Sequence, residues 1–169
     1  VHAPYLVAEH PAATPAADPA ADNAGAALQL DLPGGGHVAG IAGSINHQLV
    51  GLLAGDAALG EWIDLTGVTF ATNSVDLLDA SFPVLDDVAT ILQAYPTALV
   101  TLGVFADARG SAAYNLKMSE GRVATLEAYL IAHGVDEGRL ETVAPGEYQA
   151  RCTTSDRACM AKNRRVALT

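Results

Sequence analysis

Two oppositely charged side chains, Asp107 and Arg122, have the types and spacing to hold a small charged ligand. Asp107 follows the apolar run 98–105, which has the length and composition of a buried strand. Gly110 then permits a turn, and a helix is predicted from about Ser111 onward. A carboxylate at a strand end and a guanidinium in the next helix can face the same small volume. Such a volume would suit a ligand that carries both an ammonium and a carboxylate.

Three polar residues, one of which is Arg122, lie on the same face of the predicted helix. Asn115, Ser119 and Arg122 are spaced i, i+4 and i+7, so they form a single polar stripe. A structural salt bridge between Asp107 and Arg122 would produce the same pattern. The residues alone therefore leave a binding site and a structural ion pair open as alternatives.

The elements around this segment predict an α+β domain with the order βαβαββ. Strands and helices alternate at first and end in two strands, which favours a two-layer sandwich with a mixed sheet and helices on one face. The predicted elements are a strand at 62–70, a helix at 79–95, a strand at 98–105, a helix at 111–133, and strands at 140–143 and 165–169.

The N-terminal part of the chain is predicted to contain two further segments. Residues 1–27 are rich in Ala and Pro and cannot bury enough apolar surface to offset their ordering entropy, so we expect a disordered tether. Residues 28–63 predict a βαβ-like strand–helix–strand lead-in with a helix at 44–53, and Trp62 at its join with a domain at 64–169.

Composition limits the classes of partner. The chain has 169 residues, of which 50% are hydrophobic and 17% are charged, and its formal net charge is −10. Nothing basic is concentrated enough to neutralise a phosphate backbone, which argues against a nucleic-acid partner. The least polar long stretch, residues 38–55, contains polar residues and is shorter than the ~20 apolar residues of a membrane span.

Cys152 and Cys159 lie close together in a loop-like stretch. Their spacing is not that of a CxxC metal or redox motif, and no His lies nearby to complete a zinc site. We expect a local disulfide, and hence an oxidising compartment such as the periplasm, although two free thiols in a cytosolic loop would give the same sequence.

Several separated segments give the sequence a family resemblance. The segment 107–122 resembles the signature of the OmpA-like C-terminal domain, a family that binds peptidoglycan, and the similarity extends over about residues 64–169. The matching residues are Asp107, Gly110, Tyr114, Asn115, Met118, Ser119 and Arg122, with GVTFATNSVDL at 67–77, GRLETVAPGE at 138–147 and NRRVAL at 163–168. Some members of the family carry a disulfide in the Cys152–Cys159 segment.

The resemblance implies a ligand for the charged pair. In the family, residues at these two positions hold diaminopimelate of the peptidoglycan stem, so Asp107 would accept from its ammonium and Arg122 would hold its carboxylate. The protein would then be a non-catalytic cell-wall anchor of the periplasm or the outer-membrane-associated envelope. The alternative is a structural or protein-interaction module of the envelope with the same fold and a degenerate pocket.

Four more residues take expected roles from the resemblance. Asn115 would order the ligand loop, and Asn73 and Ser74 lie in a turn where relatives present backbone N–H groups to a ligand carboxylate. Arg164 is expected to point into the pocket and Arg165 to solvent. An ordinary helix N-terminus and a turn that merely reverses the chain would show the same residues.

The chain departs from the family pattern near the site, and an enzyme is not indicated. Ala106 stands where relatives usually have a small polar residue, and Gly121 replaces a common Arg at a cost of ~1 kcal/mol in helix stability. Ser119 has no His placed for a triad and no GxSxG turn is present. The scattered His residues suggest neither a metal site nor a cofactor.

Overall fold

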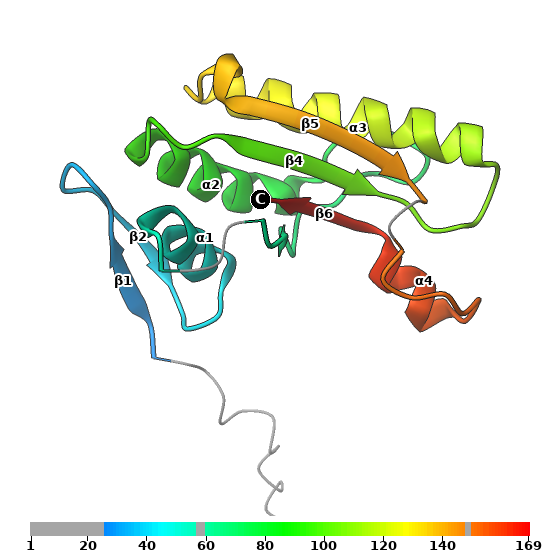
Figure 1. Ribbon diagram of the computed structural model, residues 1–169, viewed down its shortest axis with the longest axis horizontal. Helices are drawn as coiled ribbons and strands as arrows, with labels where there is room; N and C mark the ends of the chain where they lie inside the picture. The colour runs from blue at the N-terminus through cyan, green and yellow to red at the C-terminus, as the bar shows by residue number, and fades with distance from the viewer. Residues whose placement is uncertain (1–25, 57–59, 148–149) are drawn as a thin grey trace, which may run out of the picture.

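The core of the computed structural model is a four-stranded mixed sheet (Figure 1). The structure describes residues 26–56, 60–147 and 150–169, so most of the predicted tether at 1–27 lies outside the described residues. β4 pairs in parallel with β5 and antiparallel with β6, which in turn pairs antiparallel with β3. The strands, in their spatial order, are β3 (Ile63–Asp64), β6 (Arg165–Leu168), β4 (Val100–Phe105) and β5 (Leu140–Gly146).

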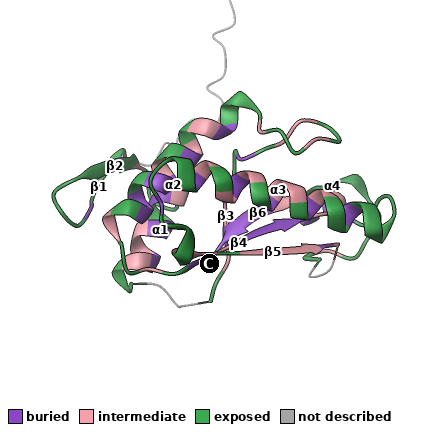
Figure 2. Cartoon of the chain, turned by 90° about the horizontal axis from the view of Figure 1, so that it is seen from above, coloured by how far each residue is buried: buried purple, intermediate pink, exposed green. Residues whose placement is uncertain are grey.

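Two helices cover one face of this sheet (Figure 2). They are α2 (Phe82–Ala94), preceded by the short 3-10 helix η2 (Asp79–Ser81), and α3 (Ala112–Ala132). A second 3-10 helix, η3 (Glu137–Arg139), leads into β5. The order β3-α2-β4-α3-β5-β6, with one further short helix between β5 and β6, confirms the predicted βαβαββ sandwich with a mixed sheet and helices on one face.

The core lies between the sheet and these two helices (Figure 2). Apolar side chains that recur at helical spacing on α2 and α3 face the sheet, as their periodicity predicts. The fully or almost fully buried ones include Leu85, Val88, Ile91, Leu92, Leu126 and Leu130. Across the described ranges, no helix combines the length and the apolar character that a bilayer crossing would require.

The first core strand is much shorter than the predicted strand at 62–70. After β3 the backbone turns, because Gly67 adopts a left-handed conformation with a φ of 100°. Leu65 and Val68 close this turn, the N–H of Val68 donating to the carbonyl of Leu65 at 3.0 Å. Only an isolated antiparallel bridge between Phe70 and Leu77 follows, and it forms the base of the loop at 71–76.

The lead-in contains one strand, at residues 37–40, that the sequence did not predict. β1 (Leu28–Asp31) pairs antiparallel with β2 (His37–Gly40), and the two form a separate hairpin (Figure 1). The third segment is α1 (Ile45–Ala54), whose first turn is capped by the Ser44 hydroxyl. β3 contains residues on both sides of the boundary predicted between 63 and 64, and it pairs with β6 in the core sheet. The division of the chain into a lead-in and a domain at that point stays a prediction.

A fourth helix, α4 (Arg157–Asn163), replaces the loop predicted after β5. Its N-cap is Asp156, whose carboxylate accepts from the N–H of Cys159 at 2.9 Å. Figure 1 shows α4 at the end of the sheet where β6 begins, apart from α2 and α3. This short helix buries only Cys159 and Asn163, so its sequence shows no apolar residues at helical spacing.

Gly103 provides a test of the packing between β4 and the lead-in. A Cβ there would lie 2.8 Å from the ring of Phe105 and 2.9 Å from the ring of Trp62, which pack edge to face. We expect Gly103→Ala to lower the free energy of unfolding by about 1–3 kcal/mol, because neither ring can move freely. Gly51→Ala in α1, where nothing lies within 4 Å, should instead stabilise by about 0.5–1 kcal/mol. Urea unfolding measures both, and an unchanged or raised stability of Gly103→Ala would contradict this packing.

Candidate functional site

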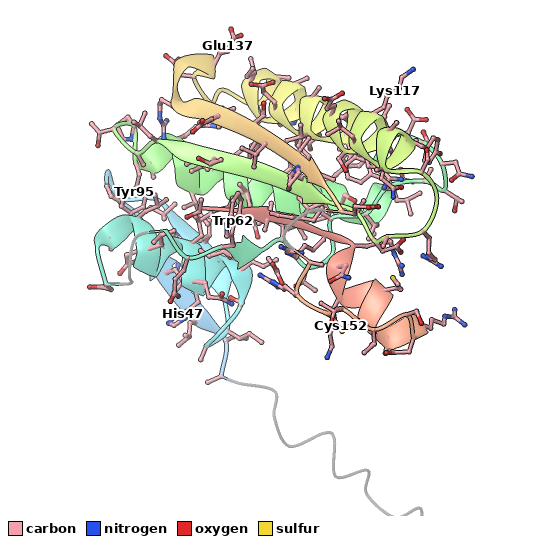
Figure 3. The ribbon with its side chains drawn as sticks, turned by 45° about the vertical axis from the view of Figure 1, so that its right-hand side comes forward. His47, Trp62, Tyr95, Lys117, Glu137 and Cys152 are labelled. Atoms are coloured by element: carbon pink, nitrogen blue, oxygen red, sulfur yellow. A yellow bond between two sulfur atoms is a disulfide. The ribbon has the colours of Figure 1, made fainter. Side chains whose placement is uncertain are left out.

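A cavity of about 680 Å³ lies where β4 ends, between α3, the loop at 71–76 and the segment that joins α4 to β6. Polar and charged side chains from all four segments line it. They include Asn73, Asp107, Arg109, Tyr114, Asn115, Ser119, Arg122, Arg164 and Arg165. The predicted polar stripe of α3 therefore faces this cavity as a unit. Lys117 of the same helix lies on its exposed side and points away (Figure 3).

Asp107 is the buried charge of the cavity, with an exposure of only 5%. Its Oδ2 accepts from Nε and Nη2 of Arg109 at 2.9 and 2.6 Å, and from Nη1 of Arg164 at 2.5 Å. Its Oδ1 accepts from the backbone N–H of Arg109 at 2.9 Å. Burial alone would raise the pKa of Asp107, but the hydrogen bonds from the two guanidinium groups outweigh it and lower this pKa to about 2. The carboxylate is therefore ionised at neutral pH.

The start of α3 fixes the backbone that carries Asp107. Ser111 caps the helix by accepting from the N–H of Tyr114 at 3.2 Å. The amide of Asn115 then donates to the backbone carbonyl of Asp107 at 3.0 Å and to Oε2 of Glu147 at 3.2 Å. Asn115 is buried, and it therefore links α3 to the ends of both β4 and β5.

Arg122 approaches the cavity from the second half of the polar stripe. Its Nε donates to the carbonyl of Ser74 at 2.9 Å, its Nη2 donates to the carbonyl of Ala71 at 3.3 Å, and its guanidinium lies 5.0 Å from the centre of the Phe70 ring. Burial lowers the pKa of Arg122 from its ordinary value. Arg122 thus fixes the loop at 71–76 against α3 and retains further N–H groups for another acceptor.

Asp107 and Arg122 line the same cavity without pairing with each other. The ion pairs of Asp107 are with Arg109 and Arg164, so the structural salt bridge considered from the sequence is not formed. Sequence reasoning missed Arg109 as a cavity residue. Arg109 could have been found from its position two residues after Asp107, because an Asp side chain often accepts from the backbone N–H two residues later in a tight turn.

The turn residues Asn73 and Ser74 have different positions. Asn73 lines the cavity, adopts a left-handed φ of 53°, and its Oδ1 accepts from the Tyr114 hydroxyl at 3.3 Å. The Ser74 hydroxyl donates to Asp76 at 2.6 Å and its N–H donates to Ala71 at 3.1 Å, so Ser74 meets the site only through its carbonyl.

Both Arg164 and Arg165 line the cavity. The expectation that Arg165 points to solvent is wrong: its guanidinium lies 3.6 Å from the centre of the Phe105 ring. Burial, and then the nearby charge of Arg151, lower the pKa of Arg165. The aromatic ring of β4 holds this side chain over the sheet, which the sequence alone did not indicate.

The segment around the two cysteines positions Arg164. Cys152 and Cys159 form the expected disulfide, which joins α4 to the loop before it. Cys152 lies next to this helix in Figure 3. The buried Asn163 accepts from the N–H groups of Arg151 and Cys152 at 3.0 and 3.1 Å, and donates to the carbonyl of Cys152 at 2.8 Å. These bonds fasten the loop to the end of α4, directly before Arg164.

The cavity is lined mainly by positive charges, although the whole chain is strongly acidic. Four guanidinium groups and one carboxylate line it, whereas the formal net charge of the protein is −10. Such a site attracts ligands that carry carboxylates while offering one acceptor for a cation. Among the residues that the structure describes, no group of three or more His, Cys, Asp or Glu could hold a metal ion.

Comparison with known proteins assigns the part of the chain that forms this cavity to a known family. Residues 69–164, which contain most of the cavity lining, match the OmpA family. The chain belongs to the OmpA family. The match runs from the loop after β3 to the end of α4 and leaves the lead-in hairpin and α1 outside it.

Individual relatives and a solved structure agree with this assignment. The OmpA-family chain is 35% identical over 101 residues to a peptidoglycan-associated lipoprotein of Haemophilus influenzae, covering 60% of this chain and 66% of the relative. It is 32% identical over 101 residues to the peptidoglycan-binding protein ArfA of Mycobacterium tuberculosis, covering 60% of this chain and 31% of that protein. The peptidoglycan-associated lipoprotein of Burkholderia pseudomallei superposes with a TM-score of 0.56 at 27% identity, over 60% of this chain and 86% of that structure. The chain thus spans at most about two thirds of these two curated relatives.

The ionisation of Asp107 should control acid stability. Its pKa is lowered from 3.8 to about 2 on folding, so its contribution is complete above about pH 4 and is lost as the pH falls through 2. We expect Asp107→Asn to lower the free energy of unfolding at pH 7 by about 2 kcal/mol and to flatten its decline between pH 4 and 2. Urea unfolding at several pH values measures this. The exposed Asp31→Asn serves as the control, and an unchanged acid profile in Asp107→Asn would refute the ion-pair network.

The disulfide should contribute to stability through the short loop that it closes. Reduction with dithiothreitol is expected to lower the free energy of unfolding by about 2–3 kcal/mol in the chain-entropy model. The double variant Cys152→Ser, Cys159→Ser should match the reduced protein and show no response to the reductant. Equal stability of the oxidised and reduced wild type would show that α4 and Asn163 hold this segment alone.

Proposed function

We propose that this OmpA-family chain is a non-catalytic cell-wall anchor that binds the diaminopimelate stem of peptidoglycan in the cavity. The names of its relatives supply the polymer: one is peptidoglycan-associated and another is peptidoglycan-binding. The disulfide fits an oxidising compartment, so the protein would act in the periplasm or the outer-membrane-associated envelope.

The observation that carries the proposal is the charge arrangement around Asp107. A single buried carboxylate shares one cavity with Arg109, Arg122, Arg164 and Arg165 in a strongly acidic chain. The free end of diaminopimelate carries an ammonium and a carboxylate on one carbon, and the stem peptide adds further carboxyl groups. A site with one acceptor and several guanidinium donors is complementary to that distribution.

The roles follow from the position of each group. Asp107 accepts from the ligand ammonium, and Arg122 holds the ligand carboxylate with the N–H groups not used by Ser74 and Ala71. The N–H groups of Thr72 and Asn73 donate to no acceptor in the described part of the protein, and they would add donors to the same carboxylate. Arg164 would balance the remaining negative charge of the stem.

Asn115, Asn73 and Ser74 act mainly by holding these groups in place. Asn115 fixes the carbonyl of Asp107, and Ser74 supplies the carbonyl that orients Arg122. Asn73 bonds Tyr114 at the cavity wall. Since no step of this proposal breaks or forms a covalent bond, the site needs neither a nucleophile nor a cofactor.

Binding to purified diaminopimelate-type sacculi and to a muramyl tripeptide ending in diaminopimelate tests the proposal. Arg122→Lys keeps the charge but loses the planar fork, and it should weaken tripeptide binding about tenfold or more in calorimetry. Asp107→Asn removes the negative charge that pairs with the ammonium and should have an effect of similar size. Arg157→Ala, an exposed arginine of α4 outside the cavity, is the matched control.

The decisive comparison is between the cavity variants and this control. Retention of Asp107→Asn and Arg122→Lys on sacculi at wild-type levels, with folding confirmed by circular dichroism, would exclude the cavity as the peptidoglycan site.

A further inference from the structure

Arg109 covers the carboxylate that a ligand ammonium would need. Its backbone N–H, Nε and Nη2 all donate to Asp107, and within the described ranges its side chain has no other hydrogen-bond partner. Its side chain is nevertheless 63% exposed, whereas that of Asp107 is 6% exposed. The guanidinium can therefore leave Asp107 for solvent without breaking any other hydrogen bond or ion pair among the described residues.

The acceptor capacity of Asp107 is nearly used up in this arrangement. Oδ2 receives three N–H donors, two from Arg109 and one from Arg164, and Oδ1 receives the backbone N–H of Arg109. An ammonium that arrived beside these two guanidinium groups would meet like charges at close range in a buried site. Withdrawal of one of the two arginines would free Oδ2 and remove this repulsion.

Arg164 is the more firmly anchored of the two, and its side chain is 45% exposed against 63% for Arg109. It directly follows the buried Asn163, which is bonded to the loop that the Cys152–Cys159 disulfide closes. Arg109 instead lies in the exposed turn before α3, next to Gly110 with its left-handed φ of 92°. The geometry thus singles out Arg109 as the group that moves.

We propose that Arg109 is an internal competitor, which occupies the position of the ligand ammonium on Asp107 and is displaced when the ligand binds. This inference rests on the proposed function and adds to it a device that selects ligands. Only a ligand whose cationic group replaces the guanidinium on Asp107, and whose carboxylates engage the remaining arginines, recovers the interactions that displacement breaks. An anion without an ammonium would leave Arg109 in place.

Calorimetry with two muramyl tripeptides tests this device. One ends in diaminopimelate with its free side-chain amino group, and the other carries the same amino group acetylated. We expect Arg109→Ala to bind the free form about two- to fivefold more tightly than the wild type does, because the ion pair between the exposed Arg109 side chain and the buried Asp107 no longer has to break. The acetylated form should show no such gain.

The comparison of the two ligands separates competition from long-range charge. Loss of one cationic charge weakens the attraction of both tripeptides, and it weakens that of the acetylated form more, because this form is one unit more negative. The quantity to compare is therefore the preference for the free amino group in Arg109→Ala relative to the same preference in Arg157→Ala. Arg157→Ala removes the same charge outside the cavity and measures this long-range contribution alone. Arg109→Gln, which keeps a polar side chain, serves as a second variant if Arg109→Ala does not fold.

The outcomes distinguish the two proposals. A larger preference for the free amino group in Arg109→Ala than in Arg157→Ala supports displacement. A preference equal to or smaller than that of Arg157→Ala, with normal binding by the wild type, overturns the competitor role and leaves the proposed function intact. If the wild type binds neither tripeptide, the proposed function fails and this inference fails with it.

Discussion

The burial of one carboxylate, Asp107, constrains the architecture of this cavity. A buried charge costs several kcal/mol unless it is paired and hydrogen-bonded, so the chain must deliver donors to this position. Arg109 arrives from the turn that follows β4, and Arg164 arrives from the end of α4. The capped start of α3, the disulfide and the buried Asn163 all serve to place these donors.

The same pairing gives the cavity its character. Segments that are far apart in sequence meet at one end of the sheet: the loop at 71–76, the end of β4, the first half of α3 and the residues after α4 (Figure 1). Together they concentrate guanidinium groups around one acidic residue, in a protein whose overall charge repels anions. Local focusing of charge, rather than net charge, governs what such a site attracts.

The regular elements were predictable where periodic apolar residues coincide with clear terminal signals. α3 begins after the cap Ser111 and α2 has Pro83 in its first turn, and both bury the apolar face that their sequences indicate. β2 and α4 were missed because each is short and buries few apolar side chains, so neither has a recognisable period. Gly121, unfavourable in a helix, has a tertiary reason: a Cβ there would lie 2.7 Å from Val75 of the loop at 71–76.

The sequence by itself determined the βαβαββ order, the polar stripe of α3 and the membership of Asp107 and Arg122 in one site. These features depend on local periodicity, caps and turns, which neighbouring residues encode. Only the tertiary structure decided which cations neutralise Asp107, and that Arg165 lies over Phe105 instead of in solvent. The choice among several arginines depends on distances between segments separated by tens of residues. Those distances are set by the packing of the sheet, α3 and the disulfide-closed loop.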